Sequence, residues 1–203
     1  MSETRDETIL FLPGELGERA LRARLVAGED AAYRDCYQSY APKLLRLLTG
    51  ILRNKARAEE VLQETFIAAF RGIARFRGEV GIATWLTRIA TNRAYNAIRD
   101  DSCVKRTAPP PEAEPVSRFE PQVEGRDLAR KVMAILDQMD PAKKLALLLQ
   151  AQGYTVAEIA GISAEPRGTI LARLSRSRAE LSLRMAEAGL ATQAIPASME
   201  DRS

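Results

Sequence analysis

The 203-residue sequence has no histidine at all and only two cysteines, Cys36 and Cys103. Without histidine a Ser–His–Asp triad, a Cys–His pair and a mixed Cys/His zinc site are all impossible. The two cysteines lie far apart and form no CxxC motif, so we expect no disulfide framework and a reducing, cytoplasmic environment. We predict a protein that uses no metal and no other cofactor.

Long apolar runs and aromatic residues are also scarce. Ile9–Leu12 ends at Pro13 and Leu145–Leu149 ends at Gln150, and both runs are too short to cross a bilayer. The acidic start of the chain lacks the basic region of a signal peptide, so we expect no membrane insertion. Aromatic residues make up 5% of the chain, and the dominant residues are alanine, leucine, arginine and glutamate. This composition favours an all-α fold.

Charge is distributed unevenly, although the net charge is only +3. Residues 18–106 hold 17 basic and 10 acidic side chains, and residues 126–186 hold 10 and 6. The remaining segments are acidic. Two basic blocks suggest a polyanionic partner, while a solvated arginine-rich helix surface is the alternative interpretation.

Residues 107–125 separate the basic blocks and hold five of the ten prolines together with four glutamates. Such a segment has too little apolar surface to fold and is typical of a linker. We therefore predict two small helical domains joined by a Pro/Glu-rich flexible linker. The predicted parts are an N-terminal extension (1–17), a helical bundle (18–100), the linker (101–125), a helix-turn-helix domain (126–186) and a tail (187–203).

Helical spacing of apolar residues predicts four helices in the first block. Asp30 is the expected N-cap of the first, and Pro42 is expected to start or kink the second. Thr84 is the expected cap of the fourth helix, which should turn Ile98 inward with Leu86. The predicted helices span 31–41, 42–52, 56–72 and 85–99.

The second block has the layout of a helix-turn-helix. Asp140 precedes a proline at the first position of one helix, and Thr155 forms a capping box with Glu158 at the start of a short one. A turn of about four residues leads to a basic helix that begins near Pro166. A short helix, a tight turn and a basic helix are typical of DNA-binding proteins, although an ordinary helical hairpin shares this layout.

Several ordered motifs then identify a resemblance. They are Tyr40-Ala-Pro-Lys-Leu-Leu45, Ala58-Glu-Glu-Val-Leu-Gln-Glu-Thr-Phe66, Phe76-Arg-Gly-Glu79, Thr84-Trp-Leu-Thr-Arg-Ile-Ala-Thr-Asn92, Gly153-Tyr-Thr-Val-Ala-Glu-Ile-Ala160 and Gly168-Thr-Ile170. With the basic run Arg173–Arg178, these motifs support a match over about residues 18–185. The chain resembles the extracytoplasmic-function sigma factors of bacterial RNA polymerase.

The resemblance implies residues that bind core polymerase and residues that bind the −10 element. The core-binding residues would be Glu60, Gln63, Glu64 and Phe66, although Phe66 also fits the apolar core of its helix. The residues that bind the −10 element would be Phe76, Arg77, Gly78, Arg88, Asn92 and Arg93. Trp85 is expected to be a core anchor in preference to a stacking platform for bases.

The resemblance also implies that the last helix reads the −35 element. The residues carried over are Arg167, Thr169, Arg173 and Arg176. Ala164 stands where the family usually has glycine, and Leu171 and Ala172 stand where the family has more polar residues. Leu171 could contact a thymine methyl group or pack against its own domain, and we expect it to pack.

The implied function is that of a non-enzymatic subunit that binds core RNA polymerase, directs it to −10 and −35 promoter DNA and helps to open the duplex. An anti-sigma factor is the further partner that the resemblance implies. Two alternatives are a stand-alone helix-turn-helix regulator and a metal-dependent nuclease built on Glu59, Glu60 and Glu64. The absence of other acidic clusters argues against the nuclease.

Overall fold

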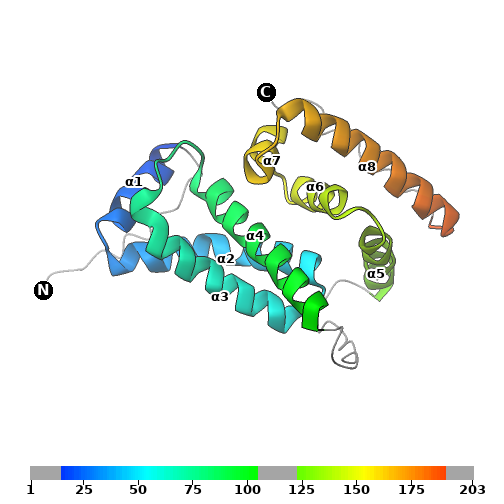
Figure 1. Ribbon diagram of the computed structural model, residues 1–203, viewed down its shortest axis with the longest axis horizontal. Coiled ribbons are helices and arrows are strands. Elements are labelled where there is room, and N and C mark those ends of the chain that lie inside the picture. Colours follow the sequence, from blue (N-terminus) through cyan, green and yellow to red (C-terminus); the bar gives the residue numbers. More distant parts are fainter. Residues whose placement is uncertain (1–14, 105–122, 191–203) are drawn as a thin grey trace, which may run out of the picture.

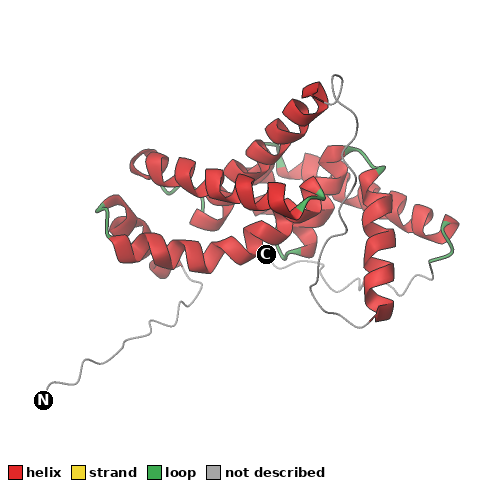
Figure 2. Ribbon diagram, turned by 90° about the horizontal axis from the view of Figure 1, so that it is seen from below, coloured by secondary structure: helices red, strands yellow, loops and turns green. Residues whose placement is uncertain are grey.

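The computed structural model describes residues 15–104 and 123–190, and every regular element within these residues is a helix (Figures 1 and 2). The all-α prediction is therefore confirmed. The elements are α1 (Glu15–Val26), α2 (Asp30–Leu52), α3 (Lys55–Gly72), the 3-10 turn η1 (Ile73–Arg75), α4 (Ile82–Val104), α5 (Val123–Asp137), α6 (Pro141–Ala151), α7 (Val156–Ser163) and α8 (Arg167–Glu187).

The helices form two groups that pack against each other. In the N-terminal group α2, α3 and α4 contact one another and α1 lies across α2 and η1. In the C-terminal group α8 contacts α5, α6 and α7. The groups meet where α7 lies on α4 and α6 lies on α2, while α8 runs along the outer side of the C-terminal group (Figure 1).

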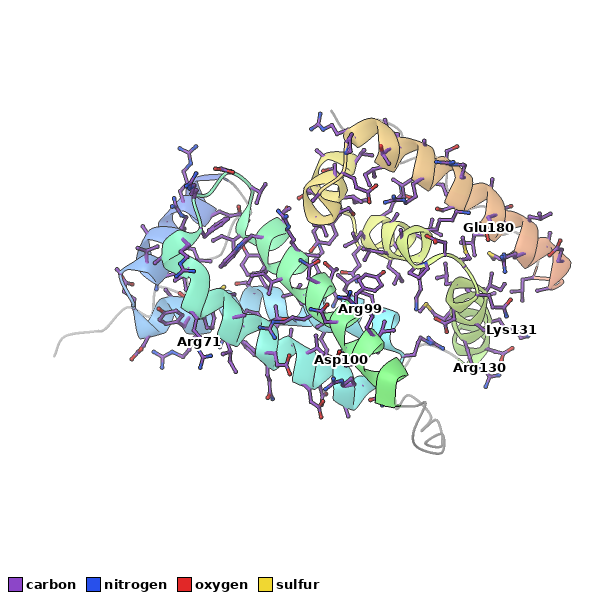
Figure 3. All side chains as sticks on the ribbon, viewed as in Figure 1. Arg71, Arg99, Asp100, Arg130, Lys131 and Glu180 are labelled. Carbon is purple, nitrogen blue, oxygen red and sulfur yellow. The ribbon has the colours of Figure 1, made fainter. Side chains whose placement is uncertain are left out.

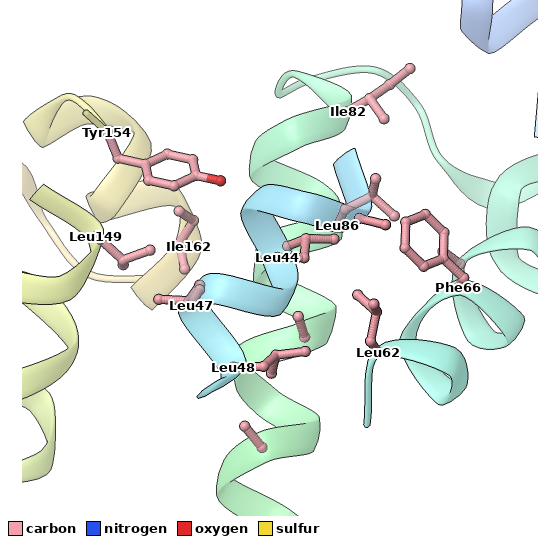
Figure 4. Close-up of a cluster of buried hydrophobic side chains, with 14 of the residues drawn as sticks. Leu44, Leu47, Leu48, Leu62, Phe66, Ile82, Leu86, Leu149, Tyr154 and Ile162 are labelled. Carbon is pink, nitrogen blue, oxygen red and sulfur yellow. The ribbon is translucent and has the colours of Figure 1, made fainter. Parts of the chain in front are cut away.

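The main apolar core is continuous across this junction. Figure 4 shows Leu47 of α2 beside Leu149 of α6 and Ile162 of α7, all of which are buried. A smaller cluster lies under α5, where Leu136 and Met139 pack with Leu181 of α8. Charged side chains such as Arg71 and Lys131 lie on the outside of the helices (Figure 3).

None of the helices in residues 15–104 and 123–190 is long and apolar enough to span a membrane.

Local capping signals in the C-terminal group are confirmed. The Asp140 carboxylate accepts from the Ala142 amide at 2.9 Å, and Pro141 occupies the first turn of α6. Thr155 and Glu158 form the predicted capping box at the start of α7. Each cap satisfies helix amides that have no partner within the helix.

The predicted division of this segment into two helices, 31–41 and 42–52, is wrong. The α2 helix runs without interruption through Pro42, and Asp30 is its first residue and not its cap. Proline removes one backbone hydrogen bond, but buried residues precede and follow it on one face, from Ala32 and Cys36 to Leu47 and beyond. Burial on both sides of Pro42 therefore favours one long helix.

The predicted start of the fourth helix is also wrong. The α4 helix begins at Ile82, and Thr84 is buried inside it, with its methyl group against Gly161 of α7. Ile98 is 37% exposed and does not turn inward, in contrast to Leu86. The position of Thr84 is set by the C-terminal group, which no local pattern reveals.

Two helices, α1 and α5, were not predicted as elements. Leu21 and Leu25 of α1 are each 1% exposed, and their i,i+4 spacing is the signal that sequence reasoning missed. Most of the predicted linker, together with most of the N-terminal extension and of the tail, lies outside the described residues.

Polar contacts also join the two groups. The Tyr154 hydroxyl lies 2.7 Å from the hydroxyl of Thr87 on α4, and both side chains are fully or almost fully buried. The Lys43 ammonium group lies 3.7 Å from the centre of the Tyr154 ring, and burial lowers the pKa of Lys43. The Tyr95 hydroxyl donates to the Pro141 carbonyl at 3.0 Å. The junction is thus a specific polar and apolar interface.

We expect Tyr154→Phe to lower the free energy of unfolding by about 1 kcal/mol, because the buried Thr87 hydroxyl loses the Tyr154 hydroxyl and keeps only its hydrogen bond to the Ala83 carbonyl. Urea denaturation followed by circular dichroism measures the change. Tyr37→Phe is the matched control, since Tyr37 is 44% exposed and its hydroxyl has no hydrogen bond within the described residues. Equal stability of Tyr154→Phe and wild type would show that the junction is not formed as described.

Candidate nucleic-acid interface

A cavity of about 840 Å³ opens between the segment that follows α3 and the outer face of α4. Most of the predicted −10 residues gather here, and Gly78 lies in the loop beside them. The lining residues are Ala68, Gly72, Arg75, Phe76, Arg77, Glu79, Val80, Trp85, Arg88, Ile89, Asn92, Arg93 and Asn96. Arg75 and Asn96 were missed by sequence reasoning, because only the fold brings them to the cavity.

The apolar wall of the cavity is a pair of stacked rings. Phe76 and Trp85 have ring centroids 4.5 Å apart and an angle of 17° between their planes. Phe76 is buried, whereas Trp85 is only half-buried and lines the cavity. Trp85 therefore packs against the main apolar core, as expected from the sequence, and its remaining surface also lines the cavity.

Positive charge surrounds this wall. Arg75, Arg77, Arg88 and Arg93 line the cavity, and Glu79 is its only carboxylate. Arg93 forms an ion pair with Glu64 of α3 at 3.0 Å, while Arg88 is exposed and has no ion-pair partner in the part of the chain that the structure describes. Such a surface attracts phosphate groups.

The Asn92 side chain is exposed and lines the cavity. Its amide makes no hydrogen bond to other residues within 15–104 and 123–190. A purely structural role for Asn92 would instead bond its amide to a backbone carbonyl of its own bundle, and no such bond is formed within the described residues. An unpaired amide offers both a donor and an acceptor to a ligand.

The predicted core-binding residues of α3 form an exposed polar face. Glu60, Gln63 and Glu64 are exposed at helical spacing. Glu60 pairs with Arg57 at 2.8 Å, and Glu64 pairs with Arg93. No group of three or more metal-ligating side chains exists among the described residues, so nothing in them resembles the acidic cluster of a metal nuclease.

Phe66 does not belong to this face. Its side chain is 3% exposed and contacts the rings of Tyr37 and Phe70 inside the bundle. The assignment of Phe66 to polymerase binding is therefore corrected. A different apolar residue, Ile67, is 51% exposed beside Glu64. It was missed because helical spacing alone does not tell which of two adjacent apolar residues, Phe66 or Ile67, faces the bundle.

The turn between α7 and α8 is held by an ion pair. Both nitrogens of the Arg173 fork donate to the Glu165 carboxylate, at 2.8 and 2.6 Å, and Arg173 has a side-chain exposure of 19%. The hydrogen bond from Arg173 holds the pKa of Glu165 below its usual value. The turn also contains Ala164 with φ of 55°, a conformation that favours glycine.

The outer face of α8 presents the other residues predicted to bind DNA. Arg167, Thr169 and Arg176 are exposed, as expected for groups that contact a duplex. Leu171 is 56% exposed on the same helix. The expectation that Leu171 packs against its own domain is therefore wrong, because Ile170 and Leu174 already fill that side.

Comparisons with known proteins agree with this geometry. Residues 36–102 match the family described as Sigma-70 region 2. The chain is 32% identical over 181 residues to the ECF RNA polymerase sigma-E factor of Haemophilus influenzae, covering 81% of this chain and 93% of that protein. The chain belongs to the ECF sigma factors. A second member, SigM of Mycobacterium tuberculosis, is 29% identical over 168 residues, which are 83% of this chain and 84% of SigM.

Two solved structures share the fold. CnrH, solved with the cytosolic domain of CnrY, has a TM-score of 0.67 and 20% identity, covering 84% of this chain and 97% of CnrH. The sigma factor RpoE, solved with the anti-sigma factor NepR from Bartonella quintana, has a TM-score of 0.64 and 22% identity, covering 76% and 96%. Members of this family are RNA polymerase sigma factors, which are transcription regulators.

We expect Glu165→Gln to lower the free energy of unfolding near neutral pH by up to about 1 kcal/mol, because it removes the charge that Arg173 pairs with. The folded-state pKa of Glu165 is lowered, so its contribution is present above the ordinary glutamate pKa and is lost as pH falls through the folded value. The difference between variant and wild type should therefore shrink in acid.

Urea denaturation at several pH values measures this effect. Glu79→Gln is the matched control, since Glu79 is exposed and lies 4.0 Å from Arg77. A Glu165→Gln protein as stable as wild type at neutral pH would contradict a role for the ion pair in holding the turn.

Proposed function

We propose that this sigma factor binds core RNA polymerase through α3, captures a base of the −10 element in the cavity beside α4, and contacts the −35 element through α8. The cavity carries the proposal: it combines stacked rings, arginines and an unpaired amide in a protein that belongs to the ECF family. This combination of groups suits a base that has left its duplex.

A flipped base needs an apolar surface, hydrogen bonds to its edge and cations for its backbone. Trp85 and Ile89 supply apolar surface, and Asn92 supplies a donor and an acceptor. Arg77 and Arg88 are exposed where the sugar-phosphate chain would leave the cavity. Capture of one base favours the opened strand over the duplex and so promotes opening.

Core binding is assigned to the exposed face of Glu60, Gln63 and Glu64. The face is polar and acidic on a chain whose net charge is positive, so it differs from the surfaces that suit DNA. Ile67 adds an exposed apolar side chain next to it. Protein interfaces commonly combine an apolar centre with a polar rim.

Contact with duplex −35 DNA is assigned to the exposed residues Arg167, Thr169 and Arg176 of α8. The α7 and α8 helices have helix-turn-helix geometry, and α8 lies on the outer side of the molecule (Figure 1). Arg173 holds the turn through Glu165 and in this state does not extend toward DNA. An anti-sigma factor is a further proposed partner, supported by the complex of RpoE, a sigma factor of this fold, with the anti-sigma factor NepR.

Run-off transcription with purified core polymerase tests the proposed function. A library of promoter fragments should yield transcripts only when both core polymerase and this chain are present. A stand-alone regulator would bind duplex fragments without polymerase and would not start transcription from them, and that result would overturn the proposal.

We expect Glu60→Lys combined with Glu64→Lys to weaken core binding at least tenfold, because both substitutions reverse charge on the proposed docking face. Co-elution with core polymerase in gel filtration measures binding. The matched control is Asp30→Lys with Glu187→Lys, which makes the same change in net charge at two other exposed positions. Unchanged co-elution of the Glu60/Glu64 variant, with a normal thermal melt, would rule out this face.

We expect Asn92→Ala to reduce promoter opening by one to two decades, because a contact to a base edge contributes about 1–3 kcal/mol. Permanganate reactivity of −10 thymines measures opening. Core binding and the melting temperature should stay at wild-type values, since Asn92 is exposed and unpaired within the described residues. Gln38→Ala, which removes an exposed amide on α2, is the control. Normal opening by Asn92→Ala would contradict base capture.

A further inference from the structure

The loop 76–82, which borders the cavity, is held at its first residue by α1. The Arg22 side chain donates through Nε to the Phe76 carbonyl at 2.9 Å. The Arg22 guanidinium carbon also lies 5.7 Å from the centre of the Phe76 ring, over its face. Arg22 therefore fixes both the backbone and the ring that stacks on Trp85.

The same helix holds the loop at its last residue. The Glu18 carboxylate accepts from the Ile82 amide at 3.2 Å, and its other oxygen accepts from the Tyr40 hydroxyl at 3.3 Å. Ile82 is the first residue of α4, so its amide has no partner within that helix. A carboxylate at a helix N-terminus is favourable because it meets the positive end of the helix dipole.

The two glycines of this loop leave room for these side chains. A Cβ atom at Gly81 would lie 2.8 Å from a carboxylate oxygen of Glu18, closer than atoms can approach. Gly78 has φ of 77°, and a Cβ atom there would lie 3.2 Å from Nη1 of Arg22. The loop and α1 are therefore fitted to each other at two points.

We propose that Glu18 and Arg22 are positioning residues for −10 recognition, because together they clamp both ends of the cavity loop. This inference rests on the proposed function of the cavity. Neither residue lines the cavity, so each acts by holding the loop in place and not by contacting DNA. A loop that is already fixed loses less conformational entropy when it binds a strand, which raises affinity.

The test is binding of polymerase holoenzyme to a fluorescent single-stranded oligonucleotide carrying the −10 segment of a promoter found by run-off transcription. We expect Glu18→Ala and Arg22→Ala each to weaken this binding about 5- to 20-fold. Affinity for core polymerase and for duplex −35 DNA should not change. Glu18→Gln keeps an acceptor for the Ile82 amide and should recover part of the loss.

Arg19→Ala is the matched control, since Arg19 is exposed on the same helix and its loss changes the net charge equally. It should bind the oligonucleotide as wild type does. Equal losses in Arg19→Ala and Arg22→Ala would mean that charge and not clamping matters, and would overturn the proposal.

Gly81→Ala provides a second, independent arm. The new methyl group should push the Glu18 carboxylate away from the Ile82 amide, so Gly81→Ala should resemble Glu18→Ala. The double variant should then bind no more weakly than either single variant, whereas two independent defects would multiply. Multiplied losses, or losses matched by equally weakened core binding, would overturn the clamp.

Asn92→Ala in the same assay separates this inference from the function on which it rests. If Asn92→Ala weakens binding and the clamp variants do not, the clamp is overturned while the cavity keeps its proposed role. If Asn92→Ala and the clamp variants all bind normally, both proposals are overturned.

Discussion

The structure depends on α4, a single helix whose surroundings differ on three sides. Leu86, Ala90 and Ala94 are buried in the N-terminal bundle. Thr84 faces Gly161 of α7, and Thr87 contacts the hydroxyl of Tyr154 in the turn that precedes α7. The remaining side of α4 lines the cavity. The proposed −10 surface therefore belongs to a helix whose other two sides are packed against the rest of the protein. Packing on two sides limits how far the cavity residues can move relative to the rest of the fold.

The junction links the two halves of the sigma factor through both α2 and α4. The apolar core runs from α2 and α4 into α6 and α7, and the Tyr95 hydroxyl reaches the Pro141 carbonyl across the junction. The exposed face of α3 and the outer face of α8 lie away from this junction (Figure 1). The surfaces proposed for polymerase and for −35 DNA therefore remain accessible while the halves are packed together.

Sequence reasoning succeeded where the cause of a structure is local. The Thr155 capping box and the Asp140 cap need only neighbouring residues, and both are formed. It failed where a feature depends on residues that lie far away in the sequence. Thr84 is covered by α7, and the first amide of α4 donates to Glu18, which lies 64 residues earlier. Burial of Phe66 agrees with its place in the apolar stripe of α3, whereas exposure of Leu171 depends on which helices pack together, which helical spacing alone does not specify.

The central claim is that the cavity beside α4 receives a −10 base in the polymerase-bound open complex. Photo-crosslinking tests it most directly, with a benzophenone-bearing residue in place of Asn96, an exposed residue of the lining. The account predicts crosslinks to one strand of the −10 element, formed only when core polymerase is present and the promoter has opened. Crosslinks that form equally on closed duplex DNA, or that map outside the −10 element, would contradict it.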